Sequence, residues 1–155
     1  MSTTRTWRTT SANDTEQLGE QIGKLLRGGE LVELASDLGG GKTTMTHGLV
    51  RGIGSSDPVA SPTFTISREY TGGRLHVYHY DLYRLHEMGV VGETLSEVLG
   101  EPGAVVIVEW GGVAEDILPE KRVVVTIKPR EDGGRDITVT APDELAYVVP
   151  AEDRA

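Results

Sequence analysis

The sequence predicts an α/β fold in which a partly parallel mixed sheet is flanked by helices. Residues 104–108, Ala-Val-Val-Ile-Val, are apolar on both strand faces, which is typical of a central parallel strand. Residues 30–35 have strand character and lead through a glycine-rich turn into a helical segment at 43–53. Apolar residues recur at every second position over 123–127 and 137–139, which indicates further strands.

The N-terminal part of the chain predicts a short edge strand followed by an amphipathic helix. Residues 5–10 have the composition of the strand. Asn13 is interpreted as the helix N-cap, with Glu16 three residues later, as in a capping box. The apolar side chains that follow share one helical face: Leu18, Ile22, Leu25 and Leu26. Gly28-Gly29 then marks the end of this helix.

The middle and the end of the chain predict two hairpins and one more helix. Residues 63–70 and 75–80 are rich in β-branched and aromatic residues, and the turn at 71–74 joins them. Residues 93–99 are expected to form a helix. The turn at 131–134, Glu-Asp-Gly-Gly, joins the last two strands into a second hairpin.

Length and composition fit one globular domain. The 155 residues are 37% hydrophobic and 25% charged, which is ordinary for a chain that forms one core. We expect a single domain over residues 1–150 and a polar, disordered tail over residues 151–155. The chain has no cysteine, which excludes disulfide bonds, thiolate zinc sites and a cysteine nucleophile.

Charge and hydropathy limit the classes of partner. The net charge is −9, which argues against strong independent binding of nucleic acid, since such binding needs a basic surface. No apolar run approaches the roughly 20 residues of a membrane span, and no apolar signal segment follows Met1. We therefore expect a cytoplasmic protein that does not associate with membranes.

Residues 36–43, Ser-Asp-Leu-Gly-Gly-Gly-Lys-Thr, form a phosphate-binding motif. A glycine-rich turn between a strand and a helix gathers backbone N–H groups where the helix dipole adds partial positive charge. Lys42 would contact the β- and γ-phosphates of ATP, and the Thr43 hydroxyl would bind Mg²⁺. Ser36 replaces the glycine of the strict pattern. The predicted phosphate-binding residues are Leu38, Gly39, Gly40, Gly41, Lys42, Thr43 and Thr44. The sequence therefore predicts a P-loop ATPase.

Such a site also needs a carboxylate for Mg²⁺ or for a water that Mg²⁺ binds. Glu109 directly follows the apolar strand 104–108, so we expect it at the carboxyl end of that strand, where ligands bind to open α/β sheets. Thr43 and Glu109 are the predicted metal-site residues. Trp110 keeps two interpretations, packing at the sheet edge or a place beside the nucleotide.

Other nucleotide-dependent activities receive less support. A GTPase would need an Asn-Lys-x-Asp motif, and the only asparagine is Asn13. For adenine, the candidate contacts are segments near Ser11 and at 128–130. A small-molecule kinase would need an arginine-bearing lid, whereas the nearest candidates, 121–122 and 128–130, flank a strand. A non-catalytic subunit that holds ATP during assembly is a third alternative, although the predicted site residues are all present.

Four segments occur together in the order and spacing of one family. They are residues 36–44 (SDLGGGKTT), 61–64 (SPTF), 79–85 (HYDLYRL) and 108–110 (VEW). Over about residues 11–128 the chain resembles TsaE, the ATPase subunit of the bacterial machinery that makes threonylcarbamoyladenosine in tRNA. The last two segments make the resemblance specific, because a phosphate loop alone occurs in many families.

The resemblance implies a partner-dependent ATPase with low turnover on its own. It would bind ATP and Mg²⁺, dock on a TsaB–TsaD heterodimer and hydrolyse ATP to sustain modification of the adenosine next to the anticodon. It would meet tRNA only through these partners. The implied catalytic residues are Lys42, Asp81 and Glu109, where Asp81 would position the attacking water or support Mg²⁺. Gly111-Gly112 departs from the Pro and acidic residue that usually follow the Glu-Trp pair.

The remaining motif residues have less defined roles. Ser61 and Thr63 match a segment that would sense the γ-phosphate. Tyr83 and Arg84 would shape that site or the partner surface. For His79, the sequence does not distinguish a packed histidine from one that takes part in the chemistry.

Overall fold

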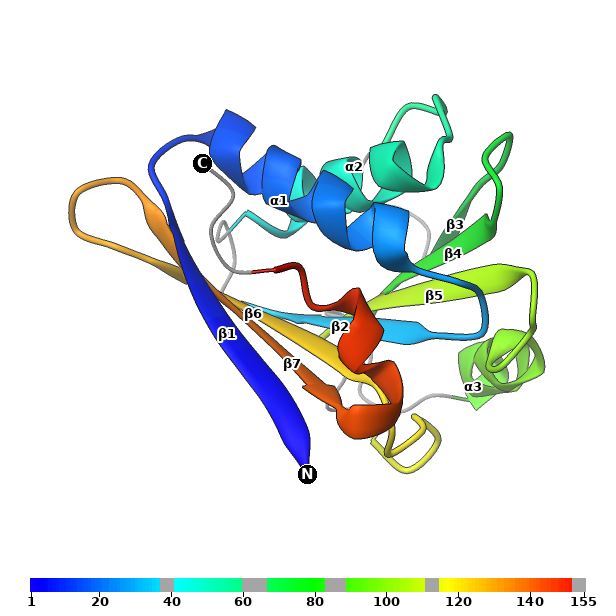
Figure 1. The fold of residues 1–155 in the computed structure, drawn as a ribbon. Coiled ribbons are helices and arrows are strands. Elements are labelled where there is room, and N and C mark those ends of the chain that lie inside the picture. The colour runs from blue at the N-terminus through cyan, green and yellow to red at the C-terminus, as the bar shows by residue number, and fades with distance from the viewer. Residues whose placement is uncertain (37–40, 60–66, 83–88, 111–114, 152–155) are drawn as a thin grey trace.

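The computed structural model describes residues 1–36, 41–59, 67–82, 89–110 and 115–151, which form a mixed α/β fold (Figure 1). Its elements are, in chain order, β1 (Ser2–Thr9), α1 (Ala12–Leu25), β2 (Leu31–Ala35), α2 (Lys42–Ile53), β3 (Ser67–Tyr70), β4 (His76–Asp81), α3 (Gly89–Val98), β5 (Ala104–Glu109), β6 (Val123–Pro129), β7 (Arg135–Pro142) and the 3₁₀ helix η2 (Asp143–Val148).

The described strands form one seven-stranded sheet in the order β1-β7-β6-β2-β5-β4-β3. β2 lies between β5 and β6 and is parallel to both, and β4 pairs with β5 in parallel. β1, β7 and β3 add to this centre through antiparallel pairing. Because the four parallel strands end at the same edge of the sheet, the segments that follow them meet there.

The helices cover the two faces of the sheet. α1 and α2 lie on one face and α3 lies on the other (Figure 1). Residues of β5 alternate between the two cores: Val105 and Ile107 pack under α1 and α2, and Val106 and Val108 pack toward α3. The same alternation directs Glu109 to the face that α1 and α2 cover. α2 is the helix that follows the glycine-rich segment.

α1 and α2 pack with their backbones in direct contact through four glycines: Gly19, Gly23, Gly48 and Gly52. A Cβ atom at Gly48 would lie 2.2 Å from the Glu16 carbonyl oxygen, and one at Gly52 would lie 2.3 Å from the Glu20 carbonyl oxygen. Only residues without a Cβ permit this approach. The glycines that weaken each helix on its own therefore set the distance between the two helices.

The N-cap of α1 is Ser11, so the prediction of Asn13 was wrong. The backbone of Ser11 is extended, and its hydroxyl accepts a hydrogen bond from the Asp14 amide at 3.1 Å. Asp14 in turn accepts hydrogen bonds from the amide and hydroxyl of Thr10, which lower the pKa of the Asp14 carboxyl, the amide having the larger effect. These contacts reach across the turn after β1, so spacing to the first apolar residue does not reveal them.

The 3₁₀ helix η2 was not predicted. Its Tyr147 hydroxyl donates to the buried Glu30 carboxylate at 2.5 Å, and that carboxylate also accepts from the amides of Arg27 and Gly28 at 2.8 and 2.7 Å. The Arg27 guanidinium lies over the Tyr147 ring, 3.9 Å from its centroid. These contacts bind the C-terminal segment to the turn before β2. Among the described helices, none is long and apolar enough to cross a membrane.

Candidate functional site

The candidate site begins at the N-terminus of α2. Gly41 has a left-handed backbone with φ of 105°, and the Met45 amide donates to its carbonyl at 3.0 Å, which starts the helix. In the described part of the chain, α2 has no side-chain cap and no acidic residue in its first turn, whereas Ser11 caps α1. The backbone amides at a helix N-terminus of this kind are groups that can bind an anionic ligand.

Lys42 is buried at the start of α2. Its ammonium donates a hydrogen bond to the Ser36 carbonyl oxygen at 3.4 Å and lies 4.7 Å from the centroid of the Trp110 ring. A cation–π contact with an indole ring favours one position of a lysine ammonium group. The end of β2 and the residue after β5 together position this cation.

Trp110 has a strained backbone, with φ of 61°, a value uncommon for a residue other than glycine. It directly follows β5, and the sharp turn in the chain brings its ring to Lys42. Of its two interpretations, the contact with Lys42 supports a place at the candidate site, although Trp110 also packs against the core near α3.

Asp81 and Glu109 lie side by side at the carboxyl edge of the sheet. The two residues are register partners in the β4–β5 pair, and Glu109 is also the partner of Leu34 near the end of β2. Glu109 is buried at 3% exposure and Asp81 is half-buried. Thr43, at the second position of α2, is exposed. The fold therefore brings the ends of β2, β4 and β5 together as the sequence predicts.

The described residues contain no cluster of three or more His, Cys, Asp or Glu side chains that could hold a metal ion. In proteins, Mg²⁺ is commonly held by one or two protein ligands together with water and substrate phosphates. The Glu109 carboxylate and the Thr43 hydroxyl are oxygen donors of the type that Mg²⁺ prefers.

His79 is fully buried and forms a hydrogen-bonded chain that the sequence did not reveal. Its Nε2 lies 2.6 Å from Oε2 of Glu109, and its Nδ1 lies 3.1 Å from the hydroxyl of the buried Tyr70. The His79 and Tyr70 rings are also in contact, with centroids 5.9 Å apart. His79 is therefore packed in the core and hydrogen-bonded to a predicted catalytic carboxylate, whereas a part of His79 in the chemistry stays a prediction.

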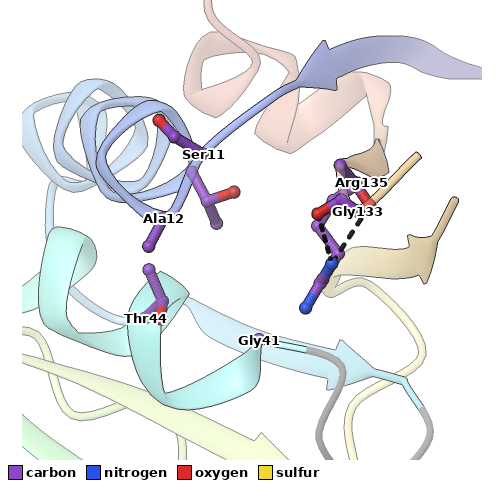
Figure 2. Close-up of a pocket in the computed structure, with 8 residues that line it drawn as sticks. Ser11, Ala12, Gly41, Thr44, Gly133 and Arg135 are labelled. Atoms are coloured by element: carbon purple, nitrogen blue, oxygen red, sulfur yellow. Dashed lines mark hydrogen bonds between the residues drawn. The ribbon is translucent and has the colours of Figure 1, made fainter.

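A cavity lies next to the start of α2 (Figure 2). Ser11, Ala12 and Thr15 line it from α1, Gly41 and Thr44 from α2, and Gly133, Gly134 and Arg135 from the hairpin of β6 and β7. The segment near Ser11 therefore lies beside Gly41 at the start of α2, and its contact with adenine stays a prediction. On the hairpin, the described lining comes from 133–135 instead of 128–130.

Arg135 was not among the predicted site residues. Its Nη1 donates to the carbonyls of Gly133 and Gly134, each at 3.1 Å, and its Nε would lie 3.7 Å from a Cβ at Gly41. A second cation thus stands near the N-terminus of α2. The sequence placed Arg135 at the start of a strand after an ordinary turn, with no local sign that the hairpin reaches the phosphate loop.

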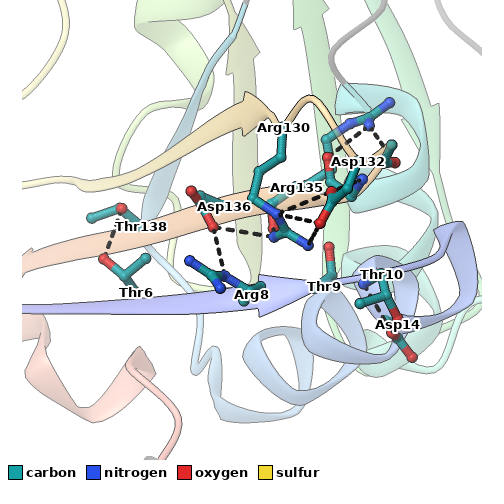
Figure 3. Close-up of polar contacts among 12 residues, drawn as sticks. Thr6, Arg8, Thr9, Thr10, Asp14, Arg130, Asp132, Arg135, Asp136 and Thr138 are labelled. Atoms are coloured by element: carbon teal, nitrogen blue, oxygen red, sulfur yellow. Dashed lines mark hydrogen bonds and ion pairs between the residues drawn. The ribbon is translucent and has the colours of Figure 1, made fainter.

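Arg130 braces the hairpin that carries this lining (Figure 3). Its Nη1 donates to the Arg135 carbonyl at 2.7 Å and to Oδ1 of Asp136 at 3.2 Å, and its Nε lies 3.2 Å from Oδ1 of Asp132. The Gly134 amide, and secondly the Arg130 guanidinium, lower the pKa of the Asp132 carboxyl. Arg130 therefore supports the turn, and the side chains nearest α2 come from the residues after it.

Several predicted positions lie outside the described residues. In the phosphate loop these are Leu38, Gly39 and Gly40. In the other motifs they are Ser61, Thr63, Tyr83, Arg84 and Gly111-Gly112. Their predicted roles stay predictions.

Comparisons with known proteins identify the family of this chain. The family model of "Threonylcarbamoyl adenosine biosynthesis protein TsaE" matches residues 9–137. A TsaE from Bacillus subtilis is 39% identical over 140 residues, covering 87% of this chain and 84% of the relative. A TsaE from Treponema pallidum is 37% identical over 129 residues, covering 83% of this chain and 95% of the relative.

A solved structure gives the same result at the level of the fold. The crystal structure of YdiB from Bacillus subtilis superimposes with a TM-score of 0.79 and 32% identity, covering 96% of this chain and 93% of that one. The match confirms the predicted P-loop NTPase-like fold. With a family model over most of its length and relatives that align almost end to end, the chain belongs to the TsaE family.

Proposed function

We propose that this protein binds Mg²⁺-ATP at the N-terminus of α2 and hydrolyses it to support threonylcarbamoyladenosine formation on tRNA. The observation that carries the proposal is the buried Lys42 beside an uncapped helix N-terminus, with Glu109 and Asp81 at the ends of adjacent strands. A cation, the amides at a helix N-terminus and carboxylates at one sheet edge form the constellation that phosphoryl transfer needs. The TsaE names of the relatives support the tRNA pathway.

In this proposal Lys42 and the first amides of α2 bind the phosphates. The ammonium would leave the Ser36 carbonyl for phosphate oxygens, which are stronger acceptors because they are charged. Thr43, exposed at the second position of the helix, would offer its hydroxyl to Mg²⁺. When bound, Mg²⁺ would neutralise charge on the transferred phosphoryl group.

The two carboxylates have separate roles. Glu109 would hold Mg²⁺ or a water bound to it, and Asp81 would accept a hydrogen bond from the attacking water or support Mg²⁺. Their equal position along adjacent parallel strands supports action on one ligand. The cavity between Ser11, Thr44 and Arg135 would take the nucleoside, since it adjoins the phosphate end of the site.

The proposal includes partner proteins. A net charge of −9 is poorly suited to direct capture of tRNA, so contact with tRNA would run through a TsaB–TsaD-type heterodimer. Work on tRNA in such a complex would place the protein in the cytoplasm. The heterodimer would raise an otherwise low rate of hydrolysis by completing the site, as partners do for many P-loop proteins.

The test is ATP hydrolysis and nucleotide affinity of the purified protein, alone and with an added TsaB–TsaD heterodimer. Lys42→Ala should abolish tight ATP binding, and Glu109→Ala should keep the fold and lose Mg²⁺-dependent turnover. Lys24→Ala is the matched lysine control, because Lys24 lies on the surface of α1 and pairs with Glu20. Unchanged ATP affinity in Lys42→Ala would contradict the site assignment.

The same assay separates the alternatives. Turnover that rises with the heterodimer and is lost in Lys42→Ala supports the partner-dependent ATPase. ATP binding without turnover in either condition favours a non-catalytic assembly subunit. Turnover that is unaffected by the heterodimer favours a small-molecule kinase or an unrelated hydrolase, and retained hydrolysis in Glu109→Ala would move the metal role to Asp81.

A further inference from the structure

We infer that Tyr70 and His79 are positioning residues that orient the Glu109 carboxylate toward the metal of the nucleotide site. The inference rests on the proposed function, because it assigns Glu109 to Mg²⁺ or its bound water. It concerns Tyr70, at the end of β3, and His79, inside β4, for which the sequence left both packing and a part in the chemistry open.

The three side chains lie on the same face of the sheet. His79 and Asp81 are two residues apart on β4, and Glu109 is the register partner of Asp81, so His79 reaches Glu109 along the diagonal between strands. Tyr70, on β3, lies opposite Val77 of β4. Its hydroxyl contacts Nδ1 of His79, the ring nitrogen that does not face Glu109. The chain of contacts runs from the sheet edge into the centre of the candidate site.

With Glu109 ionised and His79 neutral, the two hydrogen bonds take a single direction. An ionised carboxylate only accepts, so Nε2–H of His79 donates to Oε2 of Glu109 over 2.6 Å. In the neutral ring Nδ1 then accepts, and the Tyr70 hydroxyl donates to it over 3.1 Å. Tyr70 thereby selects the tautomer of His79 that donates to Glu109.

The hydrogen bond from His79 occupies one carboxylate oxygen of Glu109 and leaves the other oxygen for a ligand. Oε2 is the atom bonded to His79, and no hydrogen bond joins Oε1 to a residue in the described part of the chain. Exposures of 0% for His79 and 3% for Glu109 remove the competing water that would let the carboxylate rotate. Supporting residues of this kind fix the orientation of metal-binding carboxylates.

A second His–Glu pair in the same sheet provides a comparison. His76, at the start of β4, lies with its Nε2 2.7 Å from Oε1 of Glu69 on β3. The side chain of Glu69 is 60% exposed, and the pair lies at the opposite end of β4 from Asp81. His76 and Glu69 form the same kind of His–Glu pair as His79 and Glu109, but they are more exposed and lie away from the candidate site.

The test measures metal affinity directly, with Mn²⁺ as the probe in the presence of a non-hydrolysable ATP analogue, followed by electron paramagnetic resonance. His79→Leu removes the donor and should raise the Mn²⁺ dissociation constant about 10- to 100-fold. Tyr70→Phe removes only the hydroxyl and should raise it about 2- to 10-fold. His79→Gln keeps an N–H donor near the position of Nε2 and should stay within about 3-fold of the wild type.

Controls distinguish positioning from general stabilisation. His76→Leu removes the exposed histidine and should leave the Mn²⁺ constant unchanged, and each variant's affinity for the analogue in EDTA should match that of the wild type. If Tyr70→Phe and His79→Leu lower the melting temperature and leave the Mn²⁺ constant unchanged, the chain is structural only and the inference is overturned. If the wild type binds no Mn²⁺ with the analogue, the proposed function fails and the inference fails with it.

Discussion

Replacing Gly48 by alanine tests the close packing of α1 against α2, the two helices whose N-terminal ends line the cavity. The added Cβ would lie 2.2 Å from the Glu16 carbonyl oxygen and 3.0 Å from the Glu20 amide nitrogen, whereas ordinary contacts begin at 3.4 Å. The carbonyl must therefore move by about 1 Å, the difference between 3.4 and 2.2 Å. Both obstructing atoms belong to the backbone, so no side-chain rotation can relieve the clash.

Two opposing effects set the change in the free energy of unfolding of Gly48→Ala. Alanine is more favourable than glycine inside a helix by about 1 kcal/mol. Overpacking of a close contact costs about 1–3 kcal/mol, and a contact between two backbones belongs at the upper end. The net loss in the free energy of unfolding is therefore about 2 kcal/mol, or a fall in melting temperature of about 4–8 °C for a chain of this size.

Thermal unfolding followed by circular dichroism measures the effect, with Gly103→Ala as the matched control. A Cβ at Gly103 meets no atom within 4 Å, and its backbone is outside the left-handed region, so that variant should be neutral or slightly more stable. A separation of the helices would also shift Ser11 relative to Gly41, so ATP affinity should fall in Gly48→Ala only. A melting temperature at or above that of the wild type in Gly48→Ala would refute the reasoning.

Two further predictions concern the ends of the chain. Ser11→Ala should reduce the free energy of unfolding in urea by about 1 kcal/mol, because it removes the cap of α1. Asn13→Ala should change it by less than about 0.5 kcal/mol, and a larger effect at Asn13 would restore the capping box. Burial, and secondly the hydrogen bond to Glu30, raise the pKa of Tyr147 to about 12. Since this exceeds the ordinary value of about 10, the folded state holds that proton more tightly, and its stabilising effect is present below pH 10 and disappears toward pH 12. Phenolate absorbance should lose a component that titrates near pH 12 in Tyr147→Phe, and an unchanged curve would contradict the assignment.

Local patterns in the sequence were sufficient for most of the elements. The apolar run at 104–108 is the central parallel strand β5, and the glycine-rich turn does precede a helix that starts with Lys42. Strand and helix periodicities depend on neighbouring residues, so they can be recognised without the fold. The position of Glu109 at a strand end followed from the same reasoning, because a strand that ends in a polar residue brings that residue to the sheet edge.

Contacts between distant segments needed the tertiary structure. The cap of α1 is a local exception: Ser11, three residues before Asp14, takes the role predicted for Asn13, because several polar residues at a helix start can each serve. The bond between His79 and Glu109 depends on β4 lying next to β5, and Arg135 comes close to Gly41 because β6 ends beside β2.

The residues of the candidate site thus fall into those that local sequence indicates and those that only the fold brings together. Which residue types could bind phosphate and metal was readable from Lys42, Thr43 and Glu109, because each sits in a short motif whose spacing sets its own geometry. Which side chains hold Glu109 was decided by strand order, since Tyr70 and Glu109 are 39 positions apart in the chain and are joined through His79 in the folded sheet.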